Sequence, residues 1–210
     1  MNIKTDKSFK YDYEKLDPAS EEFTFLKKTI MTTSFLMMGY IKAKRFHIYK
    51  VNERNLVKTA VKQINNLMLY HGTSQKGATG ILKEGFRNSE KGWFGKGVYM
   101  TDCSETALSY SLSADYDCSI SFIFVNEVLK SEKMQTFEYY LTNIKHISTK
   151  PNNLFEKHIP KSRLRPTEID YMVDFKGRRY VKTQVEYMHD KYIAEASISI
   201  PRYLIVLEKK

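Results

Sequence analysis

The pattern of apolar and polar residues predicts helices near the start of the chain and mainly strands after them. Asp17 and Pro18 have the form of a helix N-cap and first helical residue. The apolar residues that then recur at helical spacing are Phe23, Leu26 and Ile30. Further helices are expected at residues 56–64, 77–83 and about 102–112. The segments predicted as strands are 45–51, 67–70, 97–101, 119–128, 169–175, 179–187, 192–198 and 203–207.

Helix ends are marked by residues that stop or cap a helix. Gly85 is the expected left-handed C-cap of helix 77–83, and Asp102 or Ser104 is the expected N-cap of the helix that passes through Tyr110. Helices come first and strands follow, which favours an α+β fold over a parallel sheet built from βαβ units.

The length of 210 residues and the 42% hydrophobic content predict one domain over 1–210 with a core of its own. No repeat, low-complexity tract or linker divides the chain, so residues 1–66 are expected to belong to that same domain. The longest apolar run, 35–41, is far shorter than a membrane span. With no signal-peptide pattern either, we expect an intracellular protein, cytoplasmic or nuclear, and no membrane partner.

Basic residues exceed acidic ones by 34 − 24 = 10. They cluster at 42–45, 161–165 and 176–179, which indicates either a solvated basic surface or a nucleic-acid or acidic-protein partner. The two cysteines, Cys103 and Cys118, form neither a disulfide framework nor a zinc motif, which favours a reducing compartment.

Two common ligand motifs are excluded. The segment GWFGKG, 92–97, fits neither a Walker loop nor a dinucleotide fingerprint, because the glycine and lysine positions are wrong for both. The five histidines lack metal-ligand spacing, so no metal is expected.

Three motifs follow one another within about forty residues. They are LYHGTS at 69–74, GILKEGF at 80–86 and GWFGKGVYMTDCSETALSY at 92–110, and Tyr99 and Tyr110 are eleven residues apart in the last. This ordered set resembles the catalytic domain of the poly(ADP-ribose) polymerase-like ADP-ribosyltransferase family. The resemblance extends to FHIYKVNERNL at 46–56 and PRYLI at 201–205, and leaves about 130–165 unmatched.

The resemblance implies the fold of that family, with split antiparallel or mixed β-sheets flanked by helices. It also implies that NAD is the substrate, without a metal, and that the family's regulatory helical subdomain is missing. Breaking the bond between nicotinamide and ribose passes through a state with oxocarbenium character. Such a site must hold a planar cationic ring, and tyrosine faces suit a pyridinium.

The residue roles follow from the matched positions. Tyr99 and Tyr110 are expected on the two faces of the nicotinamide ring, and the Gly72 backbone against its carboxamide. His71 is expected to hydrogen-bond a ribose hydroxyl on the adenosine side. Four more residues are expected near the bound NAD or at positions of the family's NAD site: Thr73, Ser74, Gly95 and Ala107. Gly95 also fits a simple turn. Cys103 fits a small buried residue better than a nucleophile.

Two positions depart from the family pattern. Where polymer-forming members have a glutamate, this chain has Asp190 by direct counting, with Lys191 or Glu186 in shifted registers. Where relatives often have a serine that binds the carboxamide, this chain has Ala107. The residues that could compensate for the missing serine are Ser104, Thr106 and Ser109.

Members without the glutamate typically transfer a single ADP-ribose. We therefore expect His71, Tyr99 and Asp190 to support mono-ADP-ribosylation of a protein acceptor, itself included, or of nucleic acid. The alternatives are a catalytically silent module that binds RNA or a protein, and an NAD glycohydrolase.

Overall fold

The computed structural model describes ten stretches of the chain. They are residues 8–32, 45–54, 67–90, 97–114, 119–128, 134–137, 171–173, 179–181, 191–194 and 196–208. The helices in them are α1 (Glu21–Thr32), α3 (Gln75–Glu84), α4 (Ser104–Ala114) and the 3-10 helix η2 (Ala196–Ile198). The strands are β1 (Tyr11–Lys15), β2 (Arg45–Glu53), β3 (Leu67–Thr73), β4 (Val98–Thr101), β5 (Ile120–Val128), β6 (Met134–Phe137), β7 (Tyr171–Val173), β8 (Arg179–Val181), β9 (Lys191–Ala194) and β10 (Ser199–Glu208).

The strands form one mixed sheet, which confirms the predicted α+β class. Its order is β1-β2-β10-β5-β3-β4-β9-β6, with β7 and β8 off this path. The neighbours along this path are antiparallel, whereas β8 pairs with β3 in parallel through Leu67 and Arg179. Hydrogen-bonded neighbours such as β2 and β10 are far apart in sequence, so the sheet brings the first and last thirds of the chain together.

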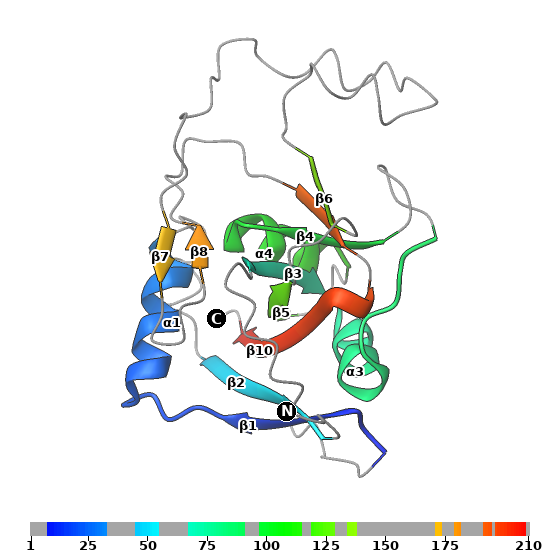
Figure 1. The fold of residues 1–210 in the computed structure, drawn as a ribbon. Helices are drawn as coiled ribbons and strands as arrows, with labels where there is room; N and C mark the ends of the chain where they lie inside the picture. Colours follow the sequence, from blue (N-terminus) through cyan, green and yellow to red (C-terminus); the bar gives the residue numbers. More distant parts are fainter. Residues whose placement is uncertain are drawn as a thin grey trace.

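Helices cover both faces of the sheet (Figure 1). Leu26 and Ile30 of α1 and Leu108 of α4 pack into one buried cluster on the first face. Ile81 and Leu82 of α3 pack into a second cluster on the opposite face. The predicted apolar stripe of the first helix is confirmed, because its three residues are all buried.

The sheet is nearly divided between β3 and β4. A single register pair, Tyr70 with Thr101, joins these two strands, whereas β3 pairs with β5 along its whole length. On the other side, β4 pairs with β9 through all of its residues. The two parts, β1-β2-β10-β5-β3 and β4-β9-β6, therefore diverge just where His71 follows Tyr70, so the expected split appears as a narrow junction within one sheet.

The first helix begins later than predicted. Asp17 heads a turn, where its carboxylate accepts the Ala19 N–H at 2.9 Å, and the hydroxyl of Ser20 accepts the Phe23 N–H at 3.2 Å. Ser20 is thus the N-cap of α1, and the assignment of this role to Asp17 was wrong. Glu22 then fixes the helix to the sheet, since it accepts the Tyr203 hydroxyl at 2.6 Å and pairs with Lys50 at 3.2 Å.

Other predicted strand bounds agree within a few residues, with one error. Residues 196–198, predicted as part of a strand, form η2, so β9 ends at Ala194 and a short helical turn leads into β10. The edge strands β1 and β6 were not predicted. The predicted helix 56–64 and the outer parts of 169–175 and 179–187 lie outside the described residues.

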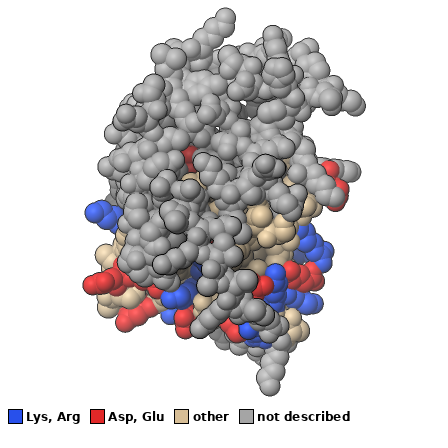
Figure 2. Space-filling model, in the orientation of Figure 1, with Lys and Arg blue, Asp and Glu red and all other residues tan. Residues whose placement is uncertain are grey.

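Charges of both signs are interspersed over the coloured part of the surface in Figure 2. Side chains of the three predicted basic clusters, 42–45, 161–165 and 176–179, are outside the described residues. Within the described ranges, no helix has the length and hydropathy needed to cross a membrane. The same ranges contain no group of three metal-ligating side chains.

Candidate active site

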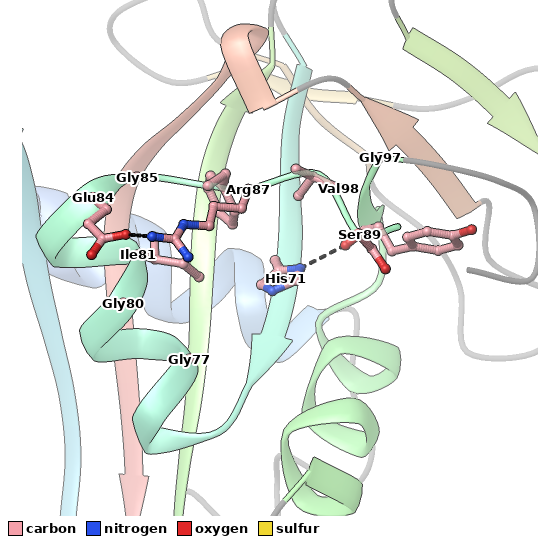
Figure 3. A pocket seen from close by; sticks show the side chains of 12 residues that line it. His71, Gly77, Gly80, Ile81, Glu84, Gly85, Arg87, Ser89, Gly97 and Val98 are labelled. Atoms are coloured by element: carbon pink, nitrogen blue, oxygen red, sulfur yellow. Dashed lines mark hydrogen bonds and ion pairs between the residues drawn. The ribbon is translucent and has the colours of Figure 1, made fainter. Parts of the chain in front are cut away.

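Two hollows open where the sheet divides, and His71 and Tyr99 line both of them. The larger is a cleft of about 530 Å³ between α3 and the start of β4. Figure 3 shows this cleft, with Gly80 of α3 on one side of His71 and Val98 of β4 on the other. Its remaining lining residues are Gly77, Ile81, Glu84, Gly85, Phe86, Arg87, Ser89 and Gly97.

The smaller hollow, of about 70 Å³, lies against α4. Its lining residues are Tyr70, His71, Gly72, Tyr99, Met100, Thr101, Ala107 and Tyr110. Tyr110 is 52% exposed, so its ring is accessible from solvent. The structure therefore brings five residues predicted from the sequence motifs, from β3, β4 and α4, to one small hollow.

A hydrogen bond between His71 and Tyr99 joins the two parts of the sheet. The Nδ1 atom of His71 lies 2.8 Å from the backbone oxygen of Tyr99. A carbonyl oxygen can only accept, so Nδ1 carries the hydrogen and donates it. In the neutral imidazole, Nε2 is then unprotonated and free to accept a hydrogen bond from a hydroxyl group.

The electrostatics favour that neutral form. Burial lowers the pKa of His71 below its ordinary value of 6.5, and the hydrogen bond to the Tyr99 backbone opposes this shift without overcoming it. At neutral pH the cleft therefore presents an uncharged acceptor at this position.

Gly72 permits the close approach of α4 to β3. A Cβ atom at this position would lie 1.6 Å from the Ala107 carbonyl oxygen. Ser111, which was not among the predicted site residues, ties the same helix to two strands. Its hydroxyl donates to the Thr73 carbonyl and accepts from the Phe122 N–H, both at 2.8 Å. A glycine and a buried serine thus fix α4 and, with it, Tyr110.

The hydroxyl of Ser74 caps the N-terminus of α3. Its oxygen accepts the Gly77 N–H at 3.1 Å, and Ser74 is the N-cap of α3, which begins at Gln75 and not at 77 as predicted. Gly85 ends this helix with a φ of +88°, as expected for a glycine C-cap. Thr73 and Ser74 are not among the described residues that line the two hollows, although both were predicted near the ligand.

Two of the serines near position 107 use their hydroxyls within the fold. Ala107 is fully buried, and Ser104 donates its hydroxyl to the Ile30 carbonyl at 2.9 Å, on the side of α1. Ser109 donates to Thr106 within α4. Cys103 is buried as expected, and burial raises the pKa of its thiol to about 11.

The backbone places Lys191, one alternative for the third position, opposite a residue of the smaller hollow. β9 runs antiparallel to β4, so that Ile193 is opposite Tyr99 and Lys191 opposite Thr101. Lys191 is the first residue of β9, and Thr101 lines the hollow. Asp190, Glu186 and Gly95 lie outside the described residues.

Comparison with known sequences agrees with this geometry. The sequence profile of the poly(ADP-ribose) polymerase catalytic domain matches residues 20–208, which is most of the chain. The chain belongs to this family, whose members are NAD-dependent ADP-ribosyltransferases.

Two relatives are poly [ADP-ribose] polymerases of insects. The protein of Drosophila melanogaster is 27% identical over 147 residues, and that of Sarcophaga peregrina is 26% identical over 149 residues. These matches cover 66% and 67% of this chain but 14% of each relative. The chain therefore corresponds to a small part of each relative's length.

Replacing Gly72 with alanine should destabilise the fold by about 1–3 kcal/mol or more, because the new methyl group overlaps the Ala107 carbonyl. Gly80→Ala is the matched control, since a Cβ there meets nothing within 4 Å and alanine is the better helix former. That variant should gain about 0.5–1 kcal/mol. Urea unfolding measures both, and equal stability of the two variants would contradict the packing described.

His71 should titrate below pH 6.5 in the folded protein. As the pH falls, the unfolded chain then takes up a proton at this position first, so the free energy of unfolding should decrease below about pH 6.5. His71→Gln, which does not titrate, should lose that part of the pH dependence. NMR titration of the imidazole checks the pKa directly, and a value above 6.5 would contradict the burial of the ring.

Proposed function

We propose that this protein transfers a single ADP-ribose unit from NAD to an acceptor and releases nicotinamide. The observation that carries the proposal is that His71 and Tyr99 line both hollows. A dinucleotide has a small aromatic cation at one end and a larger nucleoside at the other. One molecule of NAD that passes His71 and Tyr99 would place each end in a hollow of matching size.

The smaller hollow suits the nicotinamide ring. Tyr99 and Tyr110 supply aromatic faces, and each contact with a pyridinium is worth about 0.5–2 kcal/mol. Gly72 lines the same hollow, so its backbone is accessible to the carboxamide. Ala107 supplies no hydroxyl there, which predicts a weaker hold on nicotinamide than a serine would give.

The larger cleft suits the adenosine part. His71 presents Nε2 as an acceptor, which matches a ribose hydroxyl as donor. The edge of the cleft carries an ion pair between Glu84 and Arg87. The proposed contribution of Gly95 is a turn that brings its backbone near the ligand.

The proposed reaction breaks the bond from ribose C1′ to the nicotinamide nitrogen, and the bonding electrons leave with nicotinamide. Positive charge builds up on the ribose, and an acceptor oxygen or nitrogen then bonds to C1′ and loses its proton. We assign stabilisation of this charge and uptake of the proton to Asp190. Its side chain is one methylene shorter than the family's glutamate, which supports transfer of one unit only.

The same fold is compatible with two alternative functions. Ala107 and the missing glutamate favour a module that keeps the fold without catalysis and binds RNA or a protein. Water as the acceptor would make the protein an NAD glycohydrolase. The acceptor in the leading proposal is a protein, this chain included, or a nucleic-acid end.

Incubation of the protein with NAD labelled in the adenosine part separates these outcomes. Label on a protein or nucleic-acid acceptor, as one unit per site, is the expected result. His71→Ala should reduce labelling at least about a hundredfold, because it removes a positioning contact to the ribose. Free ADP-ribose as the sole product would indicate hydrolysis, and unchanged NAD would indicate the silent module.

Two near-isosteric substitutions test which residue occupies the position of the family's glutamate. Asp190→Asn removes the carboxylate and should slow transfer about a hundredfold or more. Lys191→Gln is the matched control and should stay within a few-fold of the wild-type rate. Single-turnover rates with saturating NAD measure this step, and the reverse order of effects would assign the position to Lys191.

A further inference from the structure

The rings of Phe86 and His71 make a T-shaped contact. The two ring centroids are 5.3 Å apart and the ring planes meet at 86°. Gly85 makes this possible, because its φ of +88° turns the chain at the end of α3. The half-buried ring of Phe86 also lines the larger cleft.

The ring of Phe86 is itself held in place. It lies 6.1 Å from the ring of Phe124 at 73°, and Phe124 is fully buried in β5. Two residues further on, Asn88 accepts the Ala196 N–H at 2.8 Å. Ser89 and Gly97 then exchange backbone hydrogen bonds of 2.9 and 3.2 Å. The segment after α3 is therefore fixed to η2 and to the chain before β4.

A second contact adds to the restraint on His71. The bond to Cβ and the hydrogen bond from Nδ1 to the Tyr99 carbonyl together set the ring plane, but only the hydrogen bond opposes rotation about Cβ–Cγ. A T-shaped aromatic contact is directional, so the Phe86 ring also restricts this rotation. Because rotation about Cβ–Cγ would carry Nε2 with the ring, the contact with Phe86 helps to fix the direction of Nε2.

We infer that Phe86 is a positioning residue, which holds the His71 imidazole so that Nε2 faces a ribose hydroxyl in the larger cleft. The part that concerns ribose rests on the proposed function. The part that concerns the orientation of His71 does not, because it follows from the contacts among Phe86, Phe124 and His71.

The test compares three variants. Phe86→Leu keeps an apolar side chain of similar size and removes the aromatic edge, whereas Phe86→Tyr keeps the ring. Phe46→Leu is the matched control, because Phe46 makes a similar T-shaped contact with Phe23, at 5.9 Å and 87°, on the face that carries α1. Two quantities are measured: the side-chain ¹⁵N signals of His71, and the dissociation constant for NAD.

Phe86→Leu should broaden the His71 ring signals by exchange between orientations, while the Tyr99 carbonyl keeps the hydrogen on Nδ1, and should weaken NAD binding about two- to tenfold, the range expected for one aromatic contact. Phe46→Leu should keep the wild-type values of both, and Phe86→Tyr should keep the wild-type His71 signals. Unchanged His71 signals in a folded Phe86→Leu variant would overturn the inference. Changed His71 signals in Phe86→Leu, together with wild-type protein that does not bind NAD, would instead overturn the proposed function alone.

A second measurement covers the case in which Phe86→Leu does not fold. In the wild-type protein, nuclear Overhauser contacts between the Phe86 ring protons and the His71 ring protons should be present. Their absence in the folded protein would also overturn the inference.

Discussion

The hydrogen bond from His71 Nδ1 to the Tyr99 carbonyl is the constraint on which the site depends. Beyond Tyr70 and Thr101, β3 and β4 no longer pair, and the sheet opens between them. A side chain of one strand then satisfies a backbone acceptor of the other. This bond adds to the Tyr70–Thr101 pair in joining the two parts of the sheet, fixes the tautomer of the imidazole, and leaves Nε2 available in the cleft.

The surrounding structure serves to keep this opening in one shape. On one side, α4 is brought close by Gly72 and tied down by Ser111, and it carries Tyr110 to the smaller hollow. On the other side, α3 is bounded by the Ser74 cap and by Gly85, and Phe86 follows to contact His71. Several residues of the signature motifs are thus explained by packing and capping as well as by ligand contacts.

Much of the fold and the meeting of the motif residues could be predicted from the sequence. Alternation predicted β2, and the segments that form β5 and β10 were also predicted as strands; these two are buried along most of their length. The ordered motifs predicted that Gly72, Tyr99 and Tyr110 share one site, and the smaller hollow contains all three. Their roles toward NAD stay predictions.

Other features depend on tertiary contacts and have weak sequence signals. Ser20 and Ser74 act as caps where Asp17 and a later helix start were predicted, since several neighbouring polar residues could cap each helix. The edge strand β1 is short and polar on its outer face, so its pattern is weak. Ser111 is one serine among several in its helix, and only the nearness of Thr73 and Phe122 shows its role.

The most direct test of the account is a crystal structure with an NAD analogue whose glycosidic bond cannot be cleaved. The account predicts nicotinamide in the smaller hollow between Tyr99 and Tyr110, adenosine in the larger cleft, and a ribose hydroxyl within hydrogen-bond distance of His71 Nε2. An analogue bound elsewhere on the protein, or with both ends on one side of His71, would contradict it.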